Sequence, residues 1–155
     1  MEKTTSIKIE DEIEAIRSSM LLMGGMAVEM IKYSLDGLLK GAKPSIQKTF
    51  ELEEKVNLAE VEVDAMCNKF LVLRAPAAYD LRFILCTLRM IRDIERIGDE
   101  AEKMARMAQY FHEEIQSDVP KPNLALMVTD VVTMLEKVLN AYARDDDSEL
   151  KKVIN

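Results

Sequence analysis

The sequence predicts an all-α protein built from a few long helices. Gly and Pro are scarce, with five glycines and four prolines in 155 residues, and runs of alternating β-branched residues are absent. Apolar residues recur instead at steps of three and four, which places them along one face of an α-helix. Because short connections join the first three predicted helices, we expect a long antiparallel three-helix bundle, followed by a fourth helix.

The first helix is expected from about Glu10 to Lys40. Gly41 followed closely by Pro44 predicts its end, because Gly favours the left-handed turn that closes a helix and Pro soon after cannot continue one. The apolar seam of this helix comprises Ile13, Ile16, Met20, Met23, Ala27 and Met30.

The second helix begins near Ser45, and the steps of its seam alternate between four and three residues, as in a heptad repeat. That seam comprises Leu52, Val56, Ala59, Val63, Met66, Phe70 and Leu73. Pro76 predicts a break. A third helix then runs from about Ala78 to His112, and its apolar face comprises Leu81, Ile84, Leu88, Ile91, Gly98, Ala101, Ala105 and Ala108.

A polar link from Ser117 to Asn123 leads to the fourth helix, from Leu124 to about Ala143, which resembles the first helix after a shift of 104 positions. The matching pairs include Met23 with Met127, Met30 with Met134, Ile31 with Leu135 and Leu35 with Leu139. We therefore divide the chain into a first three-helix repeat (1–116), a linker (117–123) and the first helix of an incomplete second repeat (124–155). A plain four-helix bundle is the alternative explanation of the pattern.

Composition excludes several functional classes. The net charge of −7 argues against binding to a nucleic-acid backbone. A single histidine and two distant cysteines, Cys67 and Cys86, cannot form a His/Cys zinc site or a disulfide framework. No phosphate-binding glycine loop or common catalytic motif is present, which excludes most common enzymes and leaves a metal-dependent enzyme as a distant alternative. No apolar run approaches the roughly 18–20 residues of a membrane span, so we expect a cytoplasmic protein that is at most peripheral to a membrane.

Most of the candidate functional residues lie in the segment 74–106. It reads RAPAAYDLRFILCTLRMIRDIERIGDEAEKMAR and holds six of the eight arginines, with a net charge of +1 against −8 for the rest of the chain. Arg74 and Arg82 flank the predicted bend, where guanidinium groups are suited to an anion or a partner carboxylate. The alternative is local: Asp80 caps the third helix and the arginines form ion pairs within the chain.

Two pairs of carboxylates are candidate metal ligands. Glu95 and Asp99 are four residues apart on the third helix, as are Glu60 and Asp64 on the second, beside its seam. If the pairs converge, four carboxylates form an oxygen-rich site for a hard cation such as Mg²⁺, Mn²⁺ or iron. The alternative is that ion pairs within the third helix, to Arg92 or Arg96 for example, satisfy Glu95 and Asp99.

Several motifs together resemble those of the PhoU family, the bacterial regulators of phosphate signalling. The motifs are Arg74-Ala-Pro76, Asp80-Leu-Arg82, Asp93-Ile-Glu95-Arg96-Ile-Gly98-Asp99, and Val56-Asn57-x-x-Glu60-x-x-Val63-Asp64. The resemblance implies an all-α fold of tandem three-helix repeats. It also implies a non-enzymatic regulator that links the ATPase of a phosphate ABC transporter to a sensor histidine kinase.

The resemblance further implies metal binding in some members, through Glu/Asp-x-x-x-Asp motifs that map here to Glu95 and Asp99, with Glu60 and Asp64 as the second pair. Iron, manganese, magnesium and zinc are the candidate metals, and a bound cation would lock the second and third helices together. The arginines and Asp80 of the motifs (Arg74, Asp80, Arg82, Arg92 and Arg96) are the candidate contacts to a partner or an anion.

The chain departs from the family pattern because it ends at Asn155, before a second set of motif helices. We expect either a naturally short protein or a part of a longer one. An apolar face on the fourth helix (Leu124, Val128, Val131, Leu135 and Val138) would then lack its partners, so we expect a homo-oligomer in which a second copy covers it. The alternative function is a generic helical interaction module, such as the cytosolic PhoU-like part of a phosphate co-transporter.

Overall fold

The computed structural model describes residues 2–115, 123–146 and 148, with side chains from residue 7 onward. Its elements are α1 (Glu2–Lys40), α2 (Lys43–Arg74), α3 (Ala78–Tyr110), a π-helical turn η1 (Phe111–Ile115) and α4 (Leu124–Arg144). The described residues contain no strand, so the all-α prediction is confirmed. None of the described helices is both long and apolar enough to cross a lipid bilayer.

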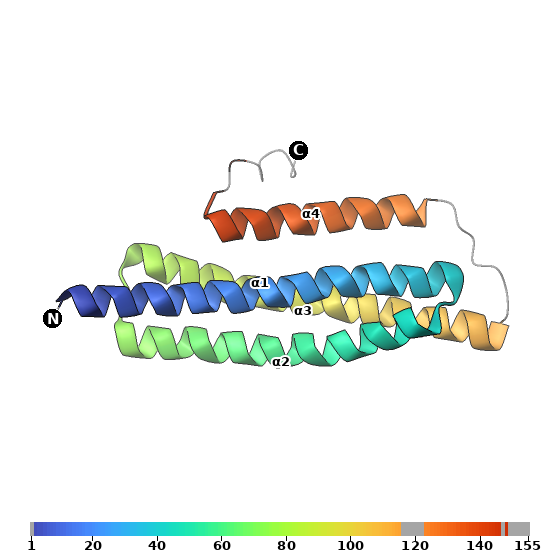
Figure 1. Cartoon of the computed structure of the whole chain (residues 1–155), viewed down its shortest axis with the longest axis horizontal. Helices are drawn as coiled ribbons and strands as arrows, with labels where there is room; N and C mark the ends of the chain where they lie inside the picture. The colour runs from blue at the N-terminus through green and yellow to red at the C-terminus, as the bar shows by residue number, and fades with distance from the viewer. Residues whose placement is uncertain (1, 116–122, 147, 149–155) are drawn as a thin grey trace.

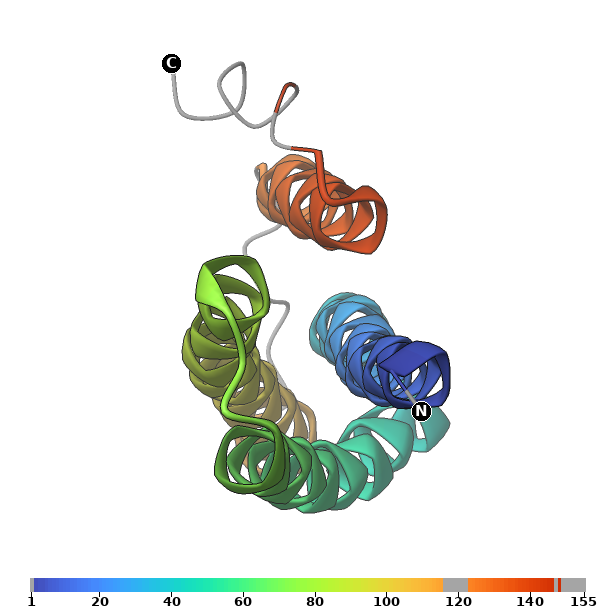
Figure 2. The same cartoon turned by 90° about the vertical axis from the view of Figure 1, so that its left-hand side faces the viewer.

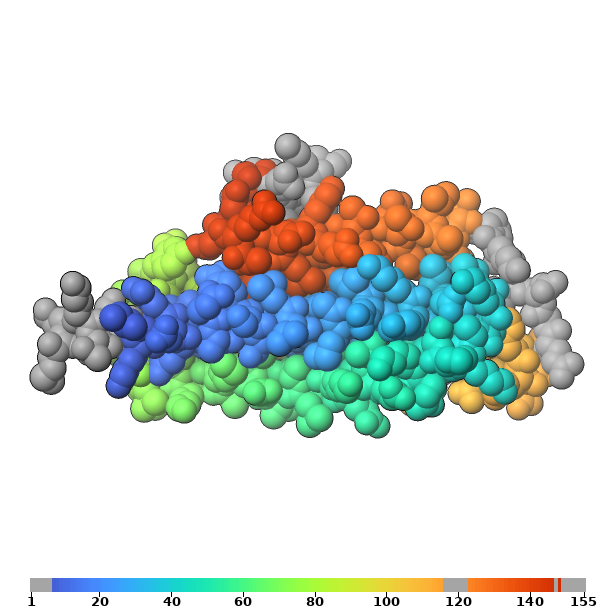
Figure 3. All heavy atoms as spheres, viewed as in Figure 1, coloured from blue at the N-terminus to red at the C-terminus, as the bar shows by residue number. Residues whose placement is uncertain are grey.

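Helices α1, α2 and α3 form an elongated antiparallel bundle (Figure 1). Figure 2 shows the bundle nearly end-on, with α4 lying across α1 and α3 on the side opposite α2. Helix α4 runs antiparallel to α1 and packs mainly against it. The space-filling view in Figure 3 shows the atoms of α4 resting directly on those of α1.

The helix ends follow the local chemistry of the chain. Helix α1 begins at Glu2 instead of about Glu10, since no Gly or Pro interrupts that stretch. Gly41 adopts a left-handed conformation with φ of 65°, which ends α1 as predicted. Pro44 lies in the first turn of α2, where its missing N–H costs no intrahelical hydrogen bond.

The predicted seams of α1, α2 and α3 form most of the bundle core. Ile16, Met20, Met23, Ala27 and Met30 of α1 are all buried, and so are Val56 and Val63 of α2 and Ile84 and Ile91 of α3. Two predictions at the α2–α3 bend are wrong, because Leu73 and Leu81 are exposed. A straight helix drifts about 20° per heptad relative to a strict seven-residue repeat, and Leu73 lies three heptads along the seam.

Two residues outside the predicted seams, one with a thiol and one with a hydroxyl, also belong to the core. Cys67 of α2 and Thr87 of α3 are both fully buried. Burial raises the pKa of the Cys67 thiol to about 12, which keeps it protonated and unreactive at neutral pH. Thr87 is tolerated in the core because its hydroxyl donates a hydrogen bond to the carbonyl oxygen of Phe83 at 3.0 Å.

The face of α4 that packs on α1 differs in part from the predicted one. The buried residues of α4 are Val132, Leu135, Leu139 and Tyr142. Leu135 belongs to the predicted apolar face, but Val131 of that face stays exposed. Gly24 of α1 permits the close approach, since a Cβ there would lie 2.9 Å from Leu139 Cδ1. The division into repeats at residues 116 and 124 stays a prediction, and part of the linker lies outside the described residues.

Candidate functional site

Four arginines of α3 form an exposed row on the outer side of the bundle. Arg82, Arg89 and Arg96 are seven residues apart, so they share one side of the helix, and Arg92 lies beside them. This arginine row (Arg82, Arg89, Arg92 and Arg96) is opposite the buried residues Ile84 and Ile91. Arg89, Arg92 and Arg96 have no ion pair within the described part of the chain, so their charges face solvent.

Arg89 is the member of the row that the sequence interpretation did not single out. It lies outside the quoted family motifs, and only its seven-residue spacing from Arg82 and Arg96 connects it with them. Arg82 makes one local contact, because its Nε donates a hydrogen bond to the carbonyl oxygen of Ala78 at 3.3 Å. The row therefore presents its guanidinium groups as donors that lack carboxylate acceptors among the described residues.

Arg74 has a different environment from the row. Its Nε and Nη2 donate to Glu12 Oε2 and Oε1 at 2.8 and 2.6 Å, a bidentate ion pair that joins the end of α2 to α1. The hydrogen bond from Arg74 lowers the pKa of the Glu12 carboxyl below its ordinary value. The role of Arg74 as a partner contact stays a prediction, but its guanidinium already has an acceptor inside the bundle.

Asp80 lies in the first turn of α3, where a negative charge is favoured by the helix dipole. The capping position itself is Ala77, and no side chain makes a capping hydrogen bond there. The carboxylate of Asp80 therefore acts on the helix end through its charge and not as a cap.

Half-buried carboxylates from α2 and α3 lie on one flank of the seam between these helices. Loss of hydration raises the pKa of the Glu95 carboxyl, and the neighbouring charges of Asp99, Glu60 and Glu53 raise it further. Arg96 opposes this shift. The two predicted Glu-x-x-x-Asp pairs thus approach one another through Glu60 and Glu95, and Arg96 offsets part of their negative charge.

The fourth predicted ligand, Asp64, is engaged elsewhere. Its Oδ2 accepts a hydrogen bond from Asn68 Nδ2 at 2.7 Å. Glu53, one turn before Asn57 and hydrogen-bonded to its amide, takes part in the electrostatics instead. The sequence interpretation missed Glu53 because it lies outside the four-residue spacing used to select the pairs.

The carboxylate oxygens are the right donor type for a hard cation, but the side chains do not assemble a centre. Within the described ranges, no three or more Asp, Glu, His or Cys side chains come together in a way that would hold a metal ion. The residues as placed therefore do not fit the predicted four-carboxylate site. Metal binding at Glu60, Asp64, Glu95 and Asp99 stays a prediction.

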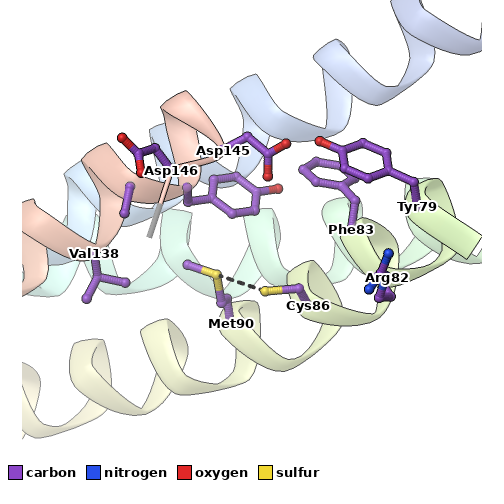
Figure 4. Close-up of a pocket in the computed structure, with 10 residues that line it drawn as sticks. Tyr79, Arg82, Phe83, Cys86, Met90, Val138, Asp145 and Asp146 are labelled. Atoms are coloured by element: carbon purple, nitrogen blue, oxygen red, sulfur yellow. Dashed lines mark hydrogen bonds between the residues drawn. The ribbon is translucent and has the colours of Figure 1, made fainter. Parts of the chain in front are cut away.

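An apolar trough separates α3 from α4 along most of the length of α4. Three hollows follow one another along it, with volumes of about 470, 290 and 540 Å³ in order from the end of α4 to its start. Figure 4 shows the first, where Asp145, directly after α4, points toward Phe83 and Tyr79 of α3, and Asp146 lies farther from both rings. The side chains of Cys86 and Met90 line the same hollow, with their sulfur atoms 3.8 Å apart.

The end of α4 packs on the bundle through contacts among Arg17, Phe83 and Tyr142. The Arg17 guanidinium lies 4.6 Å from the ring centre of Phe83, and its Nη1 donates to the carbonyl oxygen of Tyr142 at 2.6 Å. The ring of Tyr142 stacks on Phe83, and its hydroxyl lies 2.7 Å from Thr87 Oγ1. Since the single Thr87 proton goes to Phe83, Tyr142 is the donor in this bond.

The fold and these surfaces define an elongated helical-bundle protein with charged outer faces. The comparisons with known proteins identify the family. Residues 20–108 match the PhoU domain. The chain is 34% identical over 135 residues to the phosphate-specific transport system accessory protein PhoU homolog of Pseudomonas aeruginosa, covering 87% of this chain and 56% of that protein. The chain belongs to the PhoU family.

Two further comparisons agree. The phosphate-specific transport system accessory protein PhoU of Escherichia coli (strain K12) is 29% identical over 154 residues, or 99% of this chain and 63% of that protein. The crystal structure of PhoU from Pseudomonas aeruginosa matches with a TM-score of 0.80 at 32% identity, over 87% of this chain and 65% of that one. The chain thus spans between half and two thirds of the length of these relatives.

Proposed function

We propose that this protein is a cytoplasmic, non-enzymatic regulator of phosphate uptake and of the phosphate-starvation response. In this proposal it is an adaptor between the ATPase of a phosphate ABC transporter and a sensor histidine kinase. The names of its relatives, as accessory proteins of a phosphate-specific transport system, support the general role. The single observation that carries the specific role is the unpaired arginine row on the outer side of α3.

The arginine row differs from most other cations of the molecule because its guanidinium groups are unpaired among the described residues. The chain has a net charge of −7, and most of the other cations within the described ranges are already paired, such as Lys32 with Glu136 and Arg106 with Glu102. Unpaired guanidinium groups in a line are suited to bidentate bonds with carboxylates. Such a row steers an acidic partner surface towards α3 and fixes its register.

An adaptor needs a second surface, and the carboxylate flank formed by Glu53, Glu60, Glu95 and Asp99 supplies a candidate. Its charges repel one another, and after loss of hydration this repulsion is the second cause of the raised pKa of Glu95. A basic patch on a second partner would relieve this repulsion on binding. In our proposal, the arginine row contacts the transporter ATPase and the carboxylate flank contacts the kinase.

Metal binding is a separate part of the proposal, and the adaptor role does not depend on it. The donor chemistry of Glu60, Glu95 and Asp99 suits magnesium, manganese or iron more than zinc. As they are placed, these side chains do not form a metal centre. Elemental analysis of the purified protein beside a Glu95→Gln/Asp99→Asn variant tests this part on its own.

Binding to the purified transporter ATPase, measured by biolayer interferometry, tests the role of the row. The Arg89→Gln/Arg96→Gln variant is expected to weaken binding at least tenfold, since charged groups buried at an interface cost more than about 1.4 kcal/mol to remove. The Lys55→Gln/Lys69→Gln variant removes the same charge from exposed positions of α2 and serves as the control. Equal affinities of all three proteins, or no binding by any of them, would contradict the proposal.

A further inference from the structure

Leucine side chains lie beside the arginine row on the outer side of α3. Leu81 and Leu85 are 37% and 44% exposed, and Leu88 is partly buried against the core. Leu85 lies in the row itself, three residues after Arg82 and four before Arg89. Figure 2 shows no other described helix beyond α3 on the side away from α1. The outer side of α3 therefore combines guanidinium groups with exposed apolar surface.

Three columns of residues with a spacing of seven run along this side of α3. They consist of Leu81, Leu88 and Glu95, of Leu85 and Arg92, and of Arg82, Arg89 and Arg96. The charge of Glu60 on α2 acts on Glu95, so the first column lies towards α2. The residues of α3 that line the trough beside α4 form a column on the opposite flank, with Phe83, Met90 and Ile97. The leucines thus face away from the trough.

We propose that this face of α3 binds an acidic amphipathic helix of the transporter ATPase. The apolar residues of that helix pack on the leucines, and its carboxylates bind the column of Arg82, Arg89 and Arg96. The inference rests on the proposed function and adds the kind of element that the partner contributes. The face from Leu81 to Arg96 is about 22 Å long, which accommodates a helix of about four turns.

The spacing of the arginines favours a helix over an extended segment. Arginines seven residues apart lie about 10.5 Å from one another along α3. Side chains on one face of an extended strand recur about every 6.8 Å, so its carboxylates would fall out of step with the arginines. Two helices that pack at about 20° keep their seven-residue columns in contact along their length. Carboxylates seven residues apart on a partner helix therefore match all three arginines.

The charges on α3 determine the chemistry of the occupant. Asp93 is exposed at the edge of the arginine column, and no ion pair joins it to Arg89 or Arg96 in the described ranges. A purely apolar helix would bury the guanidinium groups without partners, which is costly, and a basic helix would be repelled. An acidic helix forms bidentate pairs with the arginines while its apolar side covers the leucines. Glu95 and Asp99 repel such a helix, so the face ends before them.

Substitution of the leucines tests the apolar part of the interface. Binding of the 155-residue chain to the purified transporter ATPase is measured by biolayer interferometry. The Leu81→Ser/Leu85→Ser variant is expected to bind at least tenfold more weakly, because two apolar anchors are lost. Leu58→Ser/Val61→Ser, at 71% and 67% exposed positions of α2, is the matched control and is expected to bind like the wild type. Circular dichroism verifies that each variant is folded.

The leucine and arginine variants together separate this inference from the proposed function. If Arg89→Gln/Arg96→Gln weakens binding and Leu81→Ser/Leu85→Ser does not, the adaptor role stands and the docked helix is overturned. If neither variant weakens binding, both are overturned. Loss of binding to phosphatidylglycerol vesicles in the leucine variant, with binding to the ATPase unchanged, would assign the face to a lipid surface and would also overturn the docked helix.

A crosslink identifies the element of the ATPase and does not depend on the leucine variants. A photoreactive amino acid at position 85 is expected to crosslink a helical segment of the ATPase that carries carboxylates seven residues apart. A synthetic peptide of that segment is expected to bind the 155-residue chain, by fluorescence anisotropy, and to lose affinity at least tenfold when these carboxylates become amides. Amides on the opposite face of the peptide are the control. A crosslinked loop or strand, or equal affinities of the peptides, would overturn the proposal.

Discussion

The pKa values of Glu12 and Glu95 shift in opposite directions, although both glutamates lie in the same bundle. Glu12 accepts two hydrogen bonds from Arg74, so its charged form is stabilised and its pKa is lowered. Glu95 loses hydration and faces other carboxylates, so its charged form is destabilised and its pKa is raised. The ionisation of Glu12 therefore supports the fold at neutral pH, and the ionisation of Glu95 opposes it.

The Glu95→Gln variant is expected to have a higher melting temperature than the wild type at pH 7. The folded protein holds the Glu95 proton more tightly than the unfolded chain, so stability falls as the pH rises above the ordinary value of 4.5 through the raised pKa. Glutamine removes this loss. The gain is expected to vanish below pH 4.5, where Glu95 is protonated in both states; scanning calorimetry at several pH values measures it.

The exposed Glu54→Gln variant of α2 is the matched control and is expected to change the melting temperature little. A fall in the melting temperature of Glu95→Gln at pH 7 would contradict the account. It would mean that the carboxylate of Glu95 has a favourable counter-charge, and repetition with a chelator would then show whether that charge is a bound cation.

At the scale of the helices, the contact between α4 and α1 is the least predictable from sequence. The single-helix seams of α1, α2 and α3 follow from periodicity, because each helix has one apolar face. Helix α4 has two, and periodicity alone does not say which one packs on α1. Contacts between distant residues decide it: Gly24 admits Leu139, and Arg17 holds the carbonyl oxygen of Tyr142.

Some features of the candidate site follow from spacing within one helix, whereas others depend on residues far apart in the chain. The arginine row and the Glu95–Asp99 pair follow from spacing within one helix. The partner of Arg74 is Glu12, 62 positions away, and nothing in the local sequence indicates it. The hydrogen bond between Asp64 and Asn68 spans only four residues, yet it competes with a ligand role that spacing made equally plausible.

The Tyr142→Phe variant tests whether the hydrogen bond between Tyr142 and Thr87 stabilises the packing of α4 on the bundle. The substitution removes the hydroxyl that donates to the buried Thr87, so we expect the free energy of unfolding to fall by about 1 kcal/mol. Urea denaturation followed by circular dichroism measures the change. Tyr110→Phe, which removes a hydroxyl from a 58% exposed ring, is the control and is expected to have no effect. Equal stabilities of the two variants would show that α4 does not depend on this bond.

At the scale of the whole molecule, the described surfaces of the bundle have distinct assignments. The arginine row on the outer side of α3 is proposed for the transporter ATPase, and the carboxylate flank between α2 and α3 for the kinase. Because α3 contributes to both surfaces, a rigid α3 would fix the orientation of the two partners relative to each other. The ion pair between Arg74 and Glu12 stabilises the bend that leads into this helix.

Site-specific photo-crosslinking in cells tests whether the arginine row contacts the phosphate transporter. A photoreactive amino acid is placed at Leu85, which is 44% exposed and lies between Arg82 and Arg89, or at Leu58 on the outer side of α2. The account predicts a crosslink from position 85 to the transporter ATPase, identified by mass spectrometry, and none from position 58. A crosslink to the ATPase from position 58 alone, or from neither position, would contradict the account.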